Sequence, residues 1–260
     1  MIDQFWAASK QHIDSRVNQI LADLAIEDPA PLKEMEAVCF ARGVDEIRDG
    51  CGNGVEAWLA RSPRRTIVAV GAHLSLARRR LALAHELGHV ELHEAVSQAF
   101  VCETAEMLSI YKASDVEREA NYFGAVLLMP TRFALPAVTA ALPRIDAMKG
   151  LADRFGTSLT ASALRFTELT ADECAVVLSK NGAVSWWRAG GGFAGFIKRG
   201  PLDEYTFAHD VAHSRSIPSG PQRVDADAWL SSRFQSEDFL FEESTPLGST
   251  GVVLSVLTRP

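Results

Sequence analysis

The sequence predicts an α+β protein with a mostly helical front part, which contains a small β-sheet, and a β-rich back part. Apolar residues recur at helical spacing through most of residues 4–170, which predicts the first part. Near residue 171 the pattern changes to alternating apolar and polar residues with many turn residues, which predicts the second part. A chain of 260 residues can hold two domains, and we expect them at 1–171 and 172–260.

The front part is expected to hold helices at four places before residue 130, namely 4–27, 31–42, 74–94 and 115–129. Pro31 suits a first helical turn, whereas Gly43 and Pro130 follow the ends of two of these helices. Between 44 and 72 the apolar period approaches two, and strands are expected at 55–60 and 66–70. Two or three further helices are predicted to fill 131–170.

In the back part, two β-rich runs, 175–179 and 183–187, flank Lys180-Asn181-Gly182. Asn-Gly between two strand-like runs is a strong hairpin signal. The remaining sequence is strand-like and turn-rich, and the last strand is expected at 250–257. These features predict a separate β-rich domain.

Composition limits the function classes. The net charge is −7, and residues 172–260 carry 8 basic and 11 acidic side chains, so neither part is a general nucleic-acid-binding surface; Arg78–Arg80 could be a local exception. No apolar run approaches the roughly 18 residues of a membrane span, and the N-terminus lacks a signal-peptide core, so a cytoplasmic protein without a membrane partner is expected. The four cysteines are widely spaced and are expected to be thiols.

The stretch AHELGHV contains two histidines, His85 and His89, with Glu86 directly after the first. Residues four apart share one face of a helix, so both imidazoles can reach one cation. Glu86 projects beside that cation, where it can take a proton from a water molecule. A solvated helix face is the alternative, but the apolar neighbours of these residues predict a buried helix, where unsatisfied imidazoles are costly.

A catalytic zinc site needs a third protein ligand and an open position. His93 continues the four-residue spacing but lies about 12 Å along the helix from His85, too far to share an ion. Glu117, on the next predicted helix, is the better ligand and is favoured over Glu119, which is expected at the surface. Asn121 shares the face of Glu117 and could hydrogen-bond a ligating imidazole.

The two motifs, His85-Glu86-Leu87-Gly88-His89 and Glu117-Arg118-Glu119-Ala120-Asn121, together resemble those of the ImmA/IrrE family of zinc metallopeptidases. The resemblance covers roughly residues 10–170 and departs at Gly124, where relatives commonly have alanine. It implies a zincin-like domain in which His85, His89 and Glu117 bind Zn²⁺ and Glu86 is the general base.

The family resemblance also has implications for the substrate and the back part of the chain. It implies cleavage of helix-turn-helix transcriptional repressors, which releases genes of stress response, mobile elements or phage defence. It further implies that the β-rich back part is similar to GAF or PAS sensor domains.

A protease that destroys a repressor must normally be inactive, so an inhibitory feature is expected near the site. Cys102 lies between the two metal-binding motifs, in a segment expected to be a loop near the site. Its thiolate could occupy the fourth zinc position, or the residue could be a small buried hydrophobe. An activating signal could be a small molecule, or single-stranded nucleic acid on Trp186-Trp187-Arg188 and Lys198-Arg199, although a core-packed strand is favoured there.

The leading hypothesis is therefore a hydrolase, a zinc endopeptidase regulated by its C-terminal domain. His93, Tyr111 and Tyr122 are candidates for contacting substrate or stabilising the oxyanion. The alternative is a non-proteolytic sensor or DNA-binding regulator whose zinc is structural. Glu86 separates the two hypotheses, since a structural site needs no carboxylate beside its metal.

Overall fold

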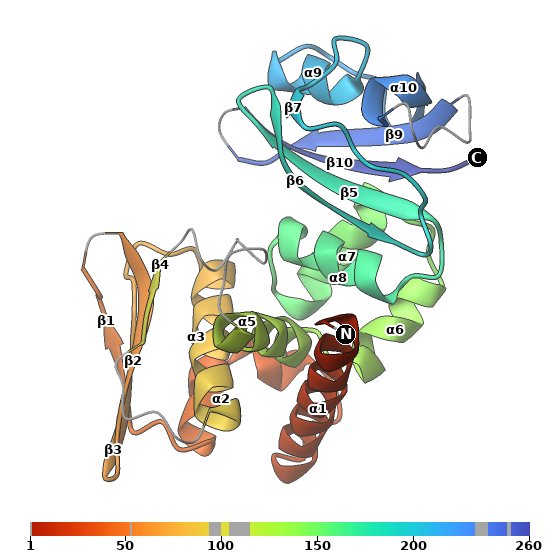
Figure 1. The fold of residues 1–260 in the computed structure, drawn as a ribbon. Coiled ribbons are helices and arrows are strands. Elements are labelled where there is room, and N and C mark those ends of the chain that lie inside the picture. Colours follow the sequence, from red (N-terminus) through yellow and green to blue (C-terminus); the bar gives the residue numbers. More distant parts are fainter. Residues whose placement is uncertain (1, 53, 94–99, 104–114, 232–238, 249–250) are drawn as a thin grey trace. The chain divides into compact units, whose positions relative to one another are not determined.

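The computed structural model describes residues 2–52, 54–93, 100–103, 115–231, 239–248 and 251–260. The chain forms two compact units (Figure 1). Unit 1 comprises Met1–Ala134 with Asp153–Ser158, and unit 2 comprises Leu135–Ala152 with Leu159–Pro260. Each unit has its own hydrophobic core.

Unit 1 combines helices with a four-stranded mixed sheet. Its helical elements are α1 (Ile2–Asp23), the 3-10 helix η1 (Ala30–Lys33), α2 (Met35–Ala41), α3 (Leu76–Leu92) and α5 (Asp115–Leu128). Its strands are β1 (Glu46–Asp49), β2 (Val55–Ser62), β3 (Arg65–Val70) and β4 (Phe100–Glu103), in the order β1-β3-β2-β4. β1 runs parallel to β3, whereas β2 is antiparallel to both β3 and β4.

The apolar faces of these elements form one core. Ile13, Val17, Ile20 and Leu21 of α1 are buried at helical spacing, and Leu83 and Leu87 of α3 join them in the same cluster. Ser75 caps α3, because its side chain accepts a hydrogen bond from the backbone N–H of Arg78. The core therefore fixes α3, the helix that carries AHELGHV.

Two predicted elements of unit 1 differ from the structure. The single helix expected at 31–42 is divided at Glu34 into η1 and α2, because Glu34 has the non-helical angles φ −99° and ψ 59°. The loop expected to carry Cys102 includes strand β4, in which Cys102 is opposite Ala57 of β2. Pairing with a partner strand made β4, and this short run has little periodicity of its own to reveal it.

Unit 2 contains a six-stranded antiparallel sheet, in the order β7-β6-β5-β10-β9-β8. The strands are β5 (Cys174–Lys180), β6 (Ala183–Gly190), β7 (Gly200–Pro201), β8 (Gln222–Asp225), β9 (Phe239–Pro246) and β10 (Val252–Thr258). The predicted hairpin joins β5 and β6, with Asn181 and Gly182 both at positive φ (52° and 73°), as a tight hairpin turn requires. The predicted α+β class, with a small sheet in front and a β-rich GAF/PAS-like part behind, is confirmed.

Helices accompany this sheet. They are α6 (Thr131–Thr139, which begins in unit 1), α7 (Ile145–Phe155), α8 (Leu159–Leu169), α9 (Phe207–Ala212) and α10 (Ala226–Trp229). α9 and α10 lie in a segment that was expected to be strand-like and turn-rich. α8 approaches the end of β6 so closely that a Cβ on Gly190 would lie 1.9 Å from the Thr167 carbonyl oxygen, so only glycine fits there.

The predicted boundary near residue 171 does not coincide with the division into units. Residues 135–152 and 159–171 group with the β-rich sheet, and α8 contacts β5 and β6 of that sheet. The division into a metallopeptidase domain at 1–171 and a β-rich domain at 172–260 stays a prediction. Within the described residues, no single helix is long and apolar enough to cross a membrane; the pair α5 and α6, bent by 68°, passes that test only when its two helices are counted together.

Candidate metal centre

The candidate site lies where α3 and α5 cross within unit 1 (Figure 1). Two glycines let the helices approach closely, one on each helix. A Cβ on Gly88 would lie 3.1 Å from both Ala120 Cα and Phe123 Cδ1, and a Cβ on Gly124 would lie 3.2 Å from the His85 backbone nitrogen. This close packing brings Glu117 of α5 to the histidines of α3.

Three ligand atoms face one another at this crossing. His85 Nε2 and His89 Nε2 are 3.1 Å apart, and the Glu117 carboxylate lies 3.2 Å from His85 Nε2 and 3.4 Å from His89 Nε2. Bonds of about 2.0–2.1 Å in a tetrahedron would separate neighbouring ligands by about 3.3 Å. Two imidazoles and one carboxylate form the donor set of a catalytic zinc site, so the residues present fit a zinc ion.

The electrostatics of the cluster favour the protonation states that metal binding needs. His85 and His89 are almost completely buried. Burial lowers the pKa of the His89 imidazole from its ordinary 6.5, and this effect outweighs the opposing effect of Glu117. Burial acts to raise the pKa of the Glu117 carboxyl, but hydrogen bonds from both histidines outweigh it and hold that pKa well below its ordinary value. A neutral imidazole and an ionised carboxylate are the metal-binding forms.

Glu86 is fully buried on α3, directly after His85 in the chain. The Glu86 carboxylate influences the pKa of the Cys51 thiol. Burial raises the pKa of the Cys51 thiol, and the Glu86 and Glu56 carboxylates raise it further. The loop that carries Cys51 therefore lies within electrostatic reach of Glu86, a proximity that the sequence did not indicate.

The Nδ1 atoms of the two histidines have different partners. His85 Nδ1 lies 3.0 Å from Asn121 Oδ1, and His89 Nδ1 lies 3.2 Å from His93 Nδ1. His93 Nε2 in turn lies 3.2 Å from Glu119 Oε2. Glu119 was expected to be a surface carboxylate, and the structure pairs it with His93. The pairing of His89 with His93 was not predicted, although their spacing of four residues places both on one helix face.

The remaining candidate residues are not gathered at this cluster by the described contacts. The Tyr122 hydroxyl donates to Asp14 Oδ2 at 3.1 Å, and its ring packs edge-on against Trp6. Tyr111 and the side chain of Cys102 lie outside the described residues, and only the backbone of Cys102 is placed, in β4. The predicted roles of these three residues stay predictions.

Two arginines of the local basic patch at Arg78–Arg80 are paired with carboxylates. Arg78 Nε pairs with the buried Glu56 carboxylate at 2.6 Å. Arg79 pairs with Glu36 and Asp49, while Arg80 donates to two backbone carbonyls. The ion pairs of Arg78 and Arg79 reduce the positive charge that this patch offers to a nucleic-acid backbone.

Trp187 of β6 follows the core-packing alternative. Trp187 packs against the core of unit 2 and contacts Phe196 edge-on, with ring centroids 6.1 Å apart. Lys198 faces Asp203 at 3.6 Å. These contacts give the tryptophan–lysine segment a structural role and lend no support to a nucleic-acid activator.

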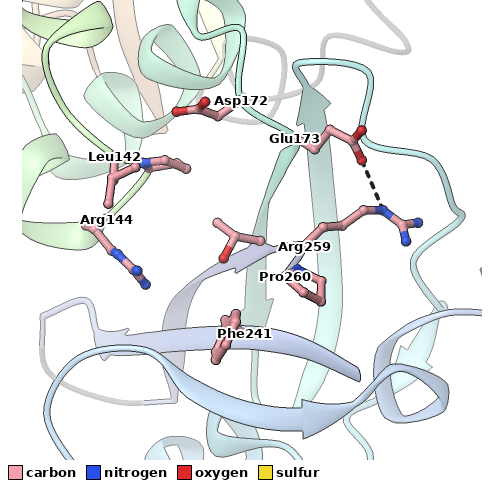
Figure 2. Close-up of a pocket in the computed structure, with 9 residues that line it drawn as sticks. Leu142, Arg144, Asp172, Glu173, Phe241, Arg259 and Pro260 are labelled. Carbon is pink, nitrogen blue, oxygen red and sulfur yellow. Dashed lines mark ion pairs between the residues drawn. The ribbon is translucent and has the colours of Figure 1, made fainter. Parts of the chain in front are cut away.

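Unit 2 also contains a cavity of about 520 Å³, which Figure 2 shows. Phe241 and Leu142 give it apolar walls, and Arg259 Nε pairs with Glu173 Oε2 across it at 3.2 Å. Arg144 and Asp172 add one more charge of each sign. The lining is balanced in charge and favours neither an anion nor a cation.

A helix with the HExxH pattern, packed against a helix that supplies a glutamate, defines the class of metallopeptidase-like domains. Residues 53–167 match the family Peptidase_M78, described as the IrrE N-terminal-like domain. This match confirms, for residues 53–167, the resemblance to the ImmA/IrrE family that the motifs predicted.

Among solved structures, the chain is similar to a Mycobacterium tuberculosis transcriptional regulator. The two are 15% identical with a TM-score of 0.63, over 99% of this chain and 79% of that chain. At this identity the likeness is one of fold. The comparison with curated proteins finds no match.

Proposed function

We propose that this protein is a zinc-dependent endopeptidase that cleaves a helix-turn-helix transcriptional repressor. The observation that carries the proposal is the cluster of His85, His89 and Glu117, whose ligand atoms lie 3.1–3.4 Å apart. Glu86 is buried on the same helix as the two histidines. The match of residues 53–167 to a peptidase family supports proteolysis as the reaction.

In the proposed mechanism, His85, His89 and Glu117 hold the zinc. When bound, zinc polarises the scissile carbonyl and makes a water molecule more acidic. Glu86 removes a proton from the attacking water and delivers it to the leaving amine. Asn121 holds the His85 ring through its Nδ1 atom.

The substrate class rests on the family resemblance. A repressor substrate agrees with the likeness in fold to a transcriptional regulator. In the proposal, cleavage in the cytoplasm releases stress, mobile-element or phage-defence genes, and the GAF/PAS-like unit 2 receives the activating signal.

The test is co-expression of the full chain with a helix-turn-helix repressor encoded beside it, under DNA damage and under phage infection. Wild type is expected to produce a repressor fragment, whereas Glu86→Gln leaves the repressor whole. Both proteins should contain one zinc ion, because Glu86 is not a ligand. An exposed control, Glu204→Gln, should cleave like wild type.

Two results would reject the proposal. If the purified wild-type protein contains no zinc, the proposed zinc-dependent hydrolysis is excluded. An intact repressor with both zinc-loaded proteins would favour the alternative from the sequence, a non-proteolytic regulator with a structural zinc, since that site has no use for Glu86.

We further propose that Cys102 keeps the enzyme latent as a fourth zinc ligand. β4, which carries Cys102, is the edge strand beside β2. Cys102→Ser is expected to raise basal repressor cleavage without lowering zinc content. Unchanged cleavage at unchanged zinc content would refute this latency, while leaving the peptidase proposal intact.

A further inference from the structure

The two predicted histidine ligands are held in different ways, and the difference has a consequence for His93. His85 Nδ1 meets an amide oxygen of Asn121, which can only accept a hydrogen bond. His89 Nδ1 meets another imidazole nitrogen, His93 Nδ1, which can donate or accept depending on its tautomer. The orientation of His89 therefore depends on where His93 carries its proton.

We infer that His93 and Glu119 form a positioning pair that fixes the tautomer and orientation of His89 for metal binding. The inference rests on the proposed zinc site. It assigns His93 to the support of a ligand, in place of the substrate-contacting or oxyanion role considered from the sequence.

The tautomers follow from the required lone pair. For His89 to bind a cation through Nε2, its proton must lie on Nδ1 and be donated to His93 Nδ1 at 3.2 Å. His93 must then accept at Nδ1 and carry its own proton on Nε2. That Nε2 lies 3.2 Å from Glu119 Oε2, a carboxylate oxygen that accepts this proton's hydrogen bond.

Glu119 is itself held in place. Ser9 Oγ of α1 donates to Glu119 Oε1, so its second oxygen remains directed at His93. The His93 side chain is 9% exposed and that of Glu119 is 28% exposed, so the contact lies at the rim of the buried site. The chain of contacts thus runs from α1 through α5 and the end of α3 to His89.

His93 is well placed to play this part. It directly follows α3, and its φ of −120° and ψ of 65° are non-helical. Its backbone N–H still donates to the His89 carbonyl, which keeps the two rings adjacent, with centroids 5.2 Å apart. Leaving the helix there turns the His93 ring towards Glu119, 26 residues further along the chain.

The test measures zinc affinity of the full chain by competition with a coloured chelator. His93→Ala is expected to weaken zinc binding about 10–100-fold, the usual cost of losing a group that orients a metal-binding histidine. His93→Asn should recover most of the affinity, because its amide oxygen can accept at the place of Nδ1. Glu119→Ala should weaken binding, and Glu119→Gln less so, since its oxygen can still accept.

His12→Gln, an exposed histidine on α1, is the matched control and should bind zinc like wild type. A second measurement is independent of the variants: ¹⁵N NMR of zinc-loaded wild type should show His89 protonated at Nδ1 and His93 protonated at Nε2. This result decides the case even where an alanine variant fails to fold.

Two outcomes would overturn the inference. One is unchanged zinc affinity in folded His93→Ala and Glu119→Ala; the other is a wild-type His93 protonated at Nδ1. Either result leaves the peptidase proposal standing. A wild type that binds no zinc removes the proposed function itself.

Discussion

Glu117 and Glu242 are two largely buried carboxylates whose surroundings move their pKa values in opposite directions. Glu117 faces two imidazoles, which outweigh its burial and lower its pKa. Glu242 is fully buried in unit 2 among neutral donors, so burial prevails and its pKa is raised from 4.5. The groups around a buried carboxylate therefore distinguish a candidate cation ligand, such as Glu117, from a structural hydrogen-bond acceptor, such as Glu242.

Glu242 connects three segments of unit 2. Its Oε1 accepts from the Ala208 backbone N–H at 2.5 Å and from Ser244 Oγ at 2.7 Å, and its Oε2 accepts from Trp229 Nε1 at 2.7 Å. Glu242→Gln would place an amide NH₂ against one of these donors. We expect it to lower the free energy of unfolding by about 1–3 kcal/mol, measured by urea denaturation.

The same carboxyl gives a pH dependence with a definite sign. Because its folded pKa lies above 4.5, its contribution to stability is full below pH 4.5 and is lost as pH rises through the folded pKa. The difference in unfolding free energy between wild type and Glu242→Gln should therefore narrow as pH rises. A difference that widens with pH would contradict the raised pKa, and the exposed Glu204→Gln should show no such trend.

At the scale of elements, the crossing of α3 and α5 determines whether the three ligand atoms meet. Gly88→Ala would press its Cβ on Ala120 and Phe123, with two contacts at 3.1 Å and a third at 3.3 Å, whereas Gly124→Ala has only one contact below 3.4 Å. We expect Gly88→Ala to cost about 1–3 kcal/mol of stability and to weaken zinc binding as the helices separate. Gly124→Ala should cost less, because its new Cβ meets fewer close contacts.

Gly150 provides the control for this pair. It lies inside α7, and a Cβ there would have nothing within 4 Å. Gly150→Ala should stabilise by about 0.5–1 kcal/mol, the gain in helix propensity. Thermal denaturation measures the stability of the three variants, and chelator competition measures their zinc affinity. Equal stability and equal zinc affinity of Gly88→Ala and Gly150→Ala would show that the crossing of α3 and α5 is not tightly packed.

At the scale of the whole molecule, all three ligand residues belong to unit 1. Zinc should therefore stabilise unit 1 selectively, by about 2.7 kcal/mol when free zinc is 100 times its Kd. Hydrogen exchange with and without a chelator should show slower exchange in α3 and α5 when zinc is present, and unchanged exchange in β5 and β10. Equal protection of both units would contradict a site confined to unit 1.

The elements with strong local patterns were predictable. α3, α5, β2, β3 and the β5–β6 hairpin lie close to their predicted ranges, because helical periodicity, caps and the Asn181-Gly182 turn are encoded within a few residues. The short elements η1, α9, α10 and β4 were missed, since so few residues carry little periodicity. The assignment of α8 to the β-rich unit depends on contacts with β5 and β6, later in the chain, which no local pattern records.

By itself, the sequence determined that His85, Glu86 and His89 share one buried helix and that a glutamate of the next helix is available to join them, since helix geometry alone relates such positions. Only the tertiary structure decided what stands behind each ligand: Asn121 behind His85, and His93 with Glu119 and Ser9 behind His89. Ser9 and Glu119 are 110 residues apart in the chain. Their meeting is a property of how α1 packs on α5, which depends on the entire core of unit 1 rather than on any local run of residues.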